Sequence, residues 1–149
     1  MRSEVPRSQI PRSQVPRSQV LRTSAPKPYL NGVSTPPPSE ITHLTADFIG
    51  ASAQQLGDQS LISGILVSAA GASGMKASGP PTVIAHPDGG LSVILPLDGC
   101  HMSVHTMPSR ELAILDVIAL PPHDPRRALD VIARKLTAKT VRAEQRTRG

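Results

Sequence analysis

The chain contains 149 residues, enough for one ordinary domain, and its scarcity of aromatic side chains (one Phe, one Tyr, no Trp) means that any core has to be aliphatic. Its single cysteine excludes an internal disulfide and a site built from several thiolates. The net charge of +5 combines two basic ends with an acidic middle, so it indicates solvated termini rather than a nucleic-acid-binding surface.

Residues 1–40 contain a five-residue repeat of the form Xaa-Pro-Arg-Ser-Gln, whose units begin at Val5, Ile10 and Val15. The proline of each unit removes a backbone donor and disfavours helix. One apolar residue per unit is also too few to offset the entropy lost when the chain is ordered. We therefore predict a disordered tail and linker over residues 1–40 and one folded domain over residues 41–149.

The first half of the predicted domain contains both strand and helix patterns. Residues 42–49 alternate between polar and apolar, which predicts a half-buried strand. Apolar residues then recur at helical spacing over 52–70, with a later helix start near Asp58 as the alternative. A short strand over 82–85 and a turn over 86–90 follow.

The second half of the predicted domain is a series of strands interrupted by one helix. Apolar runs predict strands over 91–97, 101–106 and 112–120, a helix that begins at 124, and a charged edge strand over 139–146. Short connections favour antiparallel pairing, and two amphipathic helices each need a sheet face to cover. The predicted fold class is α/β (α+β): a two-layer sandwich with a mainly antiparallel sheet and two helices on one face.

The run from Asp98 to Thr106 contains the side chains best suited to chemistry. On a strand, His101, Ser103 and His105 point to one face and Cys100 to the other. A metal site is disfavoured, because structural zinc needs four converging ligands. A Cys/His nucleophile pair is possible, although it requires a third group to orient the imidazole.

The order and spacing of these motifs resemble those of the prokaryotic S-adenosylmethionine decarboxylase family. Gly90-Leu-Ser92 and, after seven residues, Cys100-His-Met-Ser-Val-His-Thr-Met-Pro108 are similar to the family's G-x-S and S-H-x-S-x-H-T-W-P-E. Residues 112–118 resemble its A-x-x-D-V-F, and residues 43–50 resemble its H-x-x-x-D-x-x-G. The resemblance covers most of the predicted domain and implies that family's small two-layer fold.

The resemblance also implies a reaction and its site residues. In that family a serine at the position of Cys100 attacks the preceding peptide bond, so self-cleavage is expected between Gly99 and Cys100, leaving a pyruvoyl cofactor derived from Cys100. Ser92 and His105 occupy the family's processing positions, with His105 as the expected general base. The pyruvoyl carbonyl then condenses with an amine-bearing small-molecule substrate and withdraws electrons as CO₂ leaves. A role in polyamine (spermidine) biosynthesis and a homodimer are implied as well.

Besides Cys100, four positions depart from the family pattern, and all of them concern catalysis. Gly99 replaces a glutamate before the cleaved bond, and Met107 replaces an aromatic residue that contributes to holding the adenine. Ser109 replaces a glutamate that pairs with the ribose hydroxyls, and Leu120 replaces a cysteine that donates a proton after decarboxylation. A serine cannot replace a bidentate carboxylate, and a leucine cannot donate a proton.

These departures leave two alternatives beside the family's own reaction. One is a pyruvoyl-dependent decarboxylase of ornithine or arginine, in which Asp98, Glu111 or Asp124 meets a cationic side chain. The other is an unprocessed paralogue with a binding role. The sequence identifies no substrate-binding residues, and we expect no nucleic-acid or membrane partner. Because it contains neither a membrane-spanning run nor a signal-peptide pattern, a cytoplasmic location is also expected.

Overall fold

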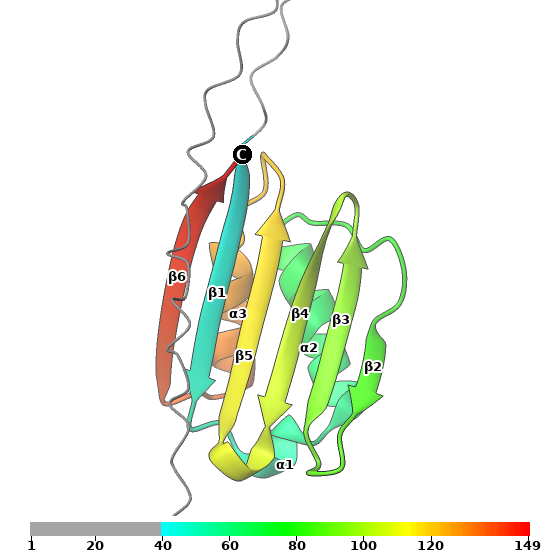
Figure 1. Cartoon of the computed structure of the whole chain (residues 1–149), viewed down its shortest axis with the longest axis vertical. Coiled ribbons are helices and arrows are strands. Elements are labelled where there is room, and N and C mark those ends of the chain that lie inside the picture. The colour runs from blue at the N-terminus through cyan, green and yellow to red at the C-terminus, as the bar shows by residue number, and fades with distance from the viewer. Residues whose placement is uncertain (1–39) are drawn as a thin grey trace, which may run out of the picture. The chain divides into compact units, whose positions relative to one another are not determined.

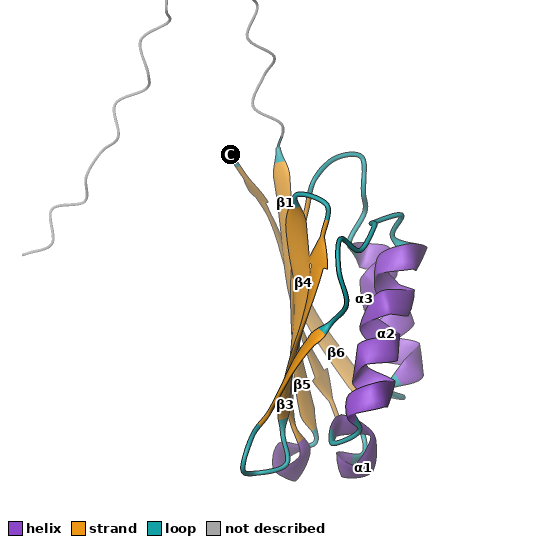
Figure 2. Ribbon diagram, turned by 90° about the vertical axis from the view of Figure 1, so that its right-hand side faces the viewer, coloured by secondary structure: helices purple, strands orange, loops and turns teal. Residues whose placement is uncertain are grey.

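The structure, a computed structural model, describes residues 40–149, which form one six-stranded sheet with helices packed on one face (Figures 1 and 2). The strands are β1 (Ile41–Ile49), β2 (Thr82–Ala85), β3 (Leu91–Leu97), β4 (Cys100–Met107), β5 (Leu112–Ala119) and β6 (Thr140–Arg148). The predicted α+β sandwich is confirmed. The predicted disordered tail, apart from Glu40, lies outside the described residues.

All neighbouring strands of the sheet pair antiparallel, in the order β2-β3-β4-β5-β1-β6. The chain therefore begins in β1, crosses to the far edge at β2, returns strand by strand to β5, and ends in β6 on the other side of β1 (Figure 1). This path places the β3–β4 hairpin, which contains the predicted site residues, inside the sheet and not at an edge.

The segment predicted as one helix forms two, α1 (Ala53–Leu56) and α2 (Gln59–Ala72). The Ser52 hydroxyl accepts a hydrogen bond from the Gln55 backbone N–H at 3.2 Å, and Asp58 Oδ1 accepts one from the Leu61 N–H at 2.9 Å. Each side chain therefore caps the start of a helix. The alternative start at Asp58 is confirmed, because that carboxylate begins a new helix instead of continuing the first.

The third helix, α3 (Arg126–Lys135), covers the half of the sheet near β1, and a short 3₁₀ turn, η1 (Pro108–Arg110), follows β4. The helix begins slightly later than predicted, because Pro125 and not Asp124 occupies the N-cap position. Asp124 Oδ1, one residue before the cap, accepts a hydrogen bond from the Arg126 backbone N–H at 3.0 Å.

The core lies between the helices and the face of the sheet that they cover, which we call the inner face; the opposite face is the outer face (Figure 2). Burial of these aliphatic side chains supplies the main driving force for folding. The largest fully buried side chains are Phe48, Leu44, Leu56, Ile62, Leu66, Leu95, Met102, Leu115, Ile132, Leu136, Val93 and Val104. Over residues 40–149, none of the helices is long and apolar enough to cross a membrane.

Candidate active site

Ser92 and His105 lie directly opposite each other on β3 and β4, on the outer face. Ser92 Oγ is 2.7 Å from His105 Nδ1, and Ser92 is only 5% exposed, so its hydroxyl is shielded from competing water. The tight turn formed by Asp98 and Gly99 fixes this register, because a two-residue hairpin loop determines which residues face each other. The structure thus brings together two of the three residues predicted for catalysis.

A second histidine, His86, contacts the same serine from the turn that follows β2. His86 Nε2 is 2.6 Å from Ser92 Oγ. Its backbone is held from both sides: its N–H donates to the Gly90 carbonyl at 2.8 Å, and its carbonyl accepts from the Gly89 N–H at 3.0 Å. The sequence marked His86 only as a turn residue, because the pairing of β2 with β3 that brings it beside Ser92 cannot be counted from residue spacing.

The predicted cleavage site lies at the turn between β3 and β4. Gly99 has φ of 77°, and a Cβ at this position would lie 2.8 Å from Leu120 Cδ1. The positive φ and the close approach of Leu120 therefore favour glycine over the glutamate of the family pattern. Cys100 is half-buried at the start of β4, where its thiol donates to the Asp98 carbonyl over 3.8 Å.

The Cys100 thiol holds its proton more tightly than an ordinary cysteine thiol. Burial is the largest cause and raises its pKa; a hydrogen bond with the backbone of Leu120 lowers it, and the negative charge of Asp98 raises it again. Because the net pKa shift is upward, the thiol is neutral near pH 7 and the nucleophilic thiolate is scarce. Attack on a peptide carbonyl from this position therefore requires a general base.

Cys100 does not lie beside Ser92 and His105 within one chain. His105 lies five positions after Cys100 along β4, and five steps at the usual rise of a strand correspond to about 17 Å. An odd spacing also directs the two side chains to opposite faces: Cys100 packs against the core, whereas His105 is exposed on the outer face. The expectation of a nearby imidazole for Cys100 is therefore wrong for a single chain.

The other family positions divide between the same two ends of the sheet. Met107 ends β4 and Ser109 lies in η1, so both accompany the Ser92–His105 pair at what we call the histidine end. Leu120 follows β5 and lies against Gly99 and Cys100, at what we call the cleavage end. In Figure 1, β4 runs from the cleavage end at the top to the histidine end at the bottom. One chain thus contains two separate halves of the family's site.

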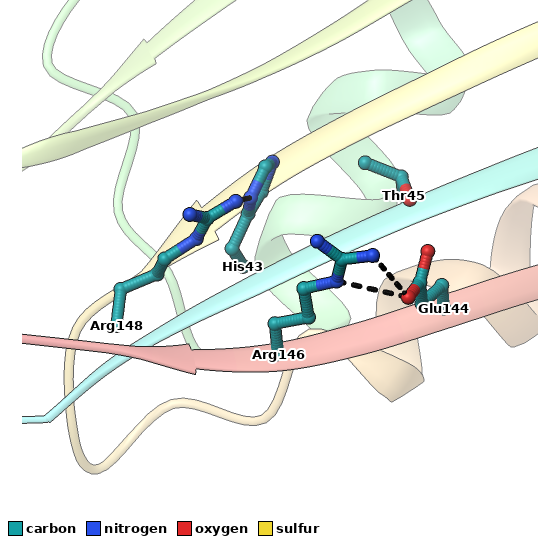
Figure 3. Close-up of a pocket in the computed structure, with 5 residues that line it drawn as sticks. All are labelled: His43, Thr45, Glu144, Arg146 and Arg148. Carbon is teal, nitrogen blue, oxygen red and sulfur yellow. Dashed lines mark hydrogen bonds and ion pairs between the residues drawn. The ribbon is translucent and has the colours of Figure 1, made fainter. Parts of the chain in front are cut away.

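A charged cluster occupies the outer face toward the cleavage end. The Asp116 carboxylate lies between two imidazoles, with Oδ2 at 2.8 Å from His43 Nε2 and Oδ1 at 3.4 Å from His101 Nε2. Arg148 Nη2 is 3.2 Å from His43 Nδ1. Beside this cluster, β1 and β6 form a hollow of about 170 Å³ lined by His43, Thr45, Glu144, Arg146 and Arg148 (Figure 3). Neither Cys100 nor Ser92 lines this hollow.

The remaining acidic residues do not gather into one site. Asp98 lies in the β3–β4 turn, Glu111 lies between η1 and the start of β5, and Asp124 lies just before the N-cap of α3. Over residues 40–149, no three His, Cys, Asp or Glu side chains are placed to hold a metal ion together.

The fold agrees with that of a known decarboxylase, and the sequence is similar to those of related proenzymes. The crystal structure of the adenosylmethionine decarboxylase from Aquifex aeolicus VF5 matches with a TM-score of 0.68 and 25% sequence identity, over 74% of this chain and 92% of that chain. The S-adenosylmethionine decarboxylase proenzyme of Pyrobaculum arsenaticum is 30% identical over 100 residues, which are 66% of this chain and 80% of the relative. The proenzyme of Caldanaerobacter subterraneus subsp. tengcongensis is 30% identical over 108 residues, which are 72% of this chain and 86% of the relative.

The family model described as S-adenosylmethionine decarboxylase matches residues 42–149, which is the whole of the described domain apart from its first two residues. The chain therefore belongs to the S-adenosylmethionine decarboxylase family. This confirms the resemblance inferred from the motifs. None of these matches gives support to ornithine or arginine as a substrate.

Proposed function

We propose that this chain is a self-cleaving, pyruvoyl-dependent S-adenosylmethionine decarboxylase that serves polyamine synthesis. The observation that carries the proposal is the direct contact of 2.7 Å between Ser92 and His105, the two residues at the family's processing positions. The thiol that replaces the family's serine lies at the bend where cleavage is expected, next to the glycine whose carbonyl it would attack.

Self-cleavage through a thiol can be written so that every atom is accounted for. The Cys100 sulfur attacks the Gly99 carbonyl carbon, the peptide C–N bond breaks, and the thiol proton passes to the freed amine, which gives a thioester. Loss of the Cys100 α-proton then breaks the Cβ–S bond, so the sulfur leaves with Gly99 as a thiocarboxylate. The dehydroalanine left at position 100 takes up water and releases ammonia, which yields the pyruvoyl group.

The residues around position 100 fit this group. It would be the new N-terminus of β4, partly buried beside Leu120, because Cys100 already occupies that place. When present, it supplies an electron-withdrawing carbonyl for decarboxylation. Leu120, at the family's proton-donor position, has no proton to give, so protonation after CO₂ loss has to come from another group. Met107 offers an apolar thioether surface at the place of the family's aromatic residue.

A homodimer is part of the proposal, because one chain separates the base from the thiol. If two copies pack their outer faces together with their strands reversed, the histidine end of each copy meets the cleavage end of the other. The second copy's imidazole at position 105 then lies at the cleavage end on the outer face, and it acts as the base once the Cys100 side chain, which packs toward the core, turns toward that face. The apolar side chains of the outer face support such a contact: Ile84 is 51% exposed, Ile94 is 39% exposed, and Ile114 is half-buried beside His105.

Intact-mass analysis of the purified full chain tests this function. We expect two fragments, one ending at Gly99 and one beginning with a pyruvoyl-blocked residue 100, and CO₂ release from S-adenosylmethionine. The Gly99 fragment should be heavier than a carboxylate by the mass difference between sulfur and oxygen. The matched control is Cys100→Ser, in which the same cleavage leaves an ordinary carboxylate, and Cys100→Ala should stay uncut. A wild-type chain that stays uncut with a free thiol would contradict the proposal.

A further inference from the structure

The inference concerns the hydrogen-bonded row His86, Ser92 and His105 on the outer face. The Ser92 hydroxyl lies between two imidazole nitrogens, 2.6 Å from His86 Nε2 and 2.7 Å from His105 Nδ1. Ser92 is nearly fully buried, whereas both histidines are exposed. Water therefore has little access to the hydroxyl in the middle and free access to both ends.

Proton counting couples the two histidines. A serine hydroxyl has one proton, so Ser92 donates to one imidazole and accepts from the other. If His105 Nδ1 donates to Ser92, Ser92 donates to His86 Nε2, and His105 Nε2 is left unprotonated on the exposed side. If the row runs the other way, His86 donates, and His105 carries its proton on Nε2. Only the first arrangement leaves His105 with a free lone pair to act as a base.

We propose that His86 is a positioning residue that fixes the base-competent tautomer of His105 through the Ser92 hydroxyl. This inference rests on the proposed role of His105 in self-cleavage. In this arrangement His86 Nε2 accepts the hydrogen bond that the Ser92 hydroxyl donates, and the row of hydrogen bonds ends there. The backbone of His86 is fixed by its hydrogen bonds with Gly89 and Gly90, which places the imidazole within reach of Ser92.

The same row offers an exit for the proton that His105 takes up. A proton arriving at His105 Nε2 allows the Nδ1 proton to pass to Ser92 and the Ser92 proton to pass to His86. His86 is exposed in the single chain and lies in the turn after the edge strand β2, from which the proton returns to solvent if the rim of the proposed dimer leaves that turn open. His86 makes no contact with the cleaved bond in this scheme. Its effect on the reaction passes entirely through Ser92 and His105.

The test uses two substitutions of His86 with different hydrogen-bonding capacity. His86→Gln keeps a side-chain oxygen that accepts from Ser92, whereas His86→Leu removes every polar atom. We expect His86→Leu to slow self-cleavage about tenfold, a part of the usual contribution of a general base, and to change its pH profile. His86→Gln should restore most of the rate. The matched control is Asp130→Asn on the exposed side of α3, outside the row and away from the cleaved bond, which should leave rate and pH profile as in the wild type.

A second readout does not depend on cleavage. In the uncut Cys100→Ala chain, ¹⁵N NMR of the imidazoles reports which His105 nitrogen carries the proton. We expect Nδ1 to be protonated when position 86 is unchanged or carries His86→Gln, and the preference to be lost in His86→Leu. An unchanged His105 tautomer in a folded His86→Leu chain would overturn the inference. If the wild-type chain does not cleave but the tautomer responds as expected, the proposed function fails and the role of His86 stands.

Discussion

At the scale of single residues, Cys100 combines a better nucleophile with a less favourable ionisation. A thiolate is the reactive form of cysteine, but burial and Asp98 both raise the pKa of this thiol and so keep the thiolate scarce. The hydrogen bond with the Leu120 backbone opposes them without cancelling them. We therefore expect the rate of attack to be limited by the small fraction of thiolate and not by the nucleophilicity of sulfur.

This ionisation can be measured by the rate of alkylation against pH in the uncut His105→Ala chain. Because the pKa is raised, the alkylation rate should reach its midpoint at a higher pH than that of an ordinary cysteine. Asp98→Asn removes a negative charge that raises the thiol pKa, so the midpoint should move to lower pH. It should stay above the midpoint of an ordinary cysteine, because burial raises the pKa more than Asp98 does. Asp130→Asn on α3 is the matched control. A midpoint at the ordinary value would contradict the assigned burial of the thiol.

At the scale of elements, one buried threonine joins the short helix α1 to the sheet. Thr106 Oγ1 donates to the Leu56 carbonyl at 2.8 Å and accepts from the Leu91 N–H at 2.9 Å, and Thr106 is 3% exposed. The hydroxyl thereby satisfies two backbone groups that have little access to water. It also fixes the start of β3, one residue before Ser92.

Thr106→Val keeps the shape of this side chain and removes both hydrogen bonds. We expect the free energy of unfolding to fall by about 2 kcal/mol, because two buried backbone groups lose their partner. Urea denaturation measures the change, and an unaltered slope would show that the folded state keeps its compactness. Thr147→Val on the exposed strand β6 is the matched control and should change stability by less than about 0.5 kcal/mol. Equal effects of the two substitutions would contradict the assigned role.

The elements show which features a sequence can determine and which it cannot. The strand from Leu91 to Leu97 and the turn after it could be predicted, because apolar runs and Asp-Gly pairs act locally. The sequence named Ser92 and His105 through the resemblance alone, and the register of the β3–β4 hairpin explains why the structure places them in contact. The contact with His86 could not be predicted, since it depends on which strand pairs with β3 on its other side. The distance from Cys100 to His105 could have been counted, because five residues on a strand always separate side chains widely.

At the scale of the whole molecule, the two-ended arrangement of the site and the composition of the outer face point to the same dimer. A face that carries Ile84, Ile94 and Ile114 beside polar site residues is unusual for an exposed sheet surface. In the proposed dimer, a two-fold contact across this face brings the histidine end of each copy to the cleavage end of the other, since an isologous interface pairs each end with its opposite. The dimer is therefore a requirement of the proposed chemistry and not an addition to it.

Mixing two inactive variants tests this requirement. Cys100→Ala keeps the Ser92–His105 pair and has no thiol to cleave, and His105→Ala keeps the thiol and has no base. We expect each chain to stay uncut alone, whereas co-refolding should cleave the His105→Ala chain, in at most about half of its copies if the two chains pair at random. Intact mass distinguishes the chains.

The specificity of this complementation is checked by adding Ile94→Lys to the His105→Ala chain. A charge on the outer face should prevent pairing and abolish the cleavage, and sedimentation should then report a monomer. Cleavage of the His105→Ala chain on its own would show that the base comes from elsewhere in the same chain. A mixture that forms mixed dimers and still stays uncut would exclude a shared site. Both outcomes would contradict the shared site without questioning the contact between Ser92 and His105, because the Cys100→Ala chain retains both residues.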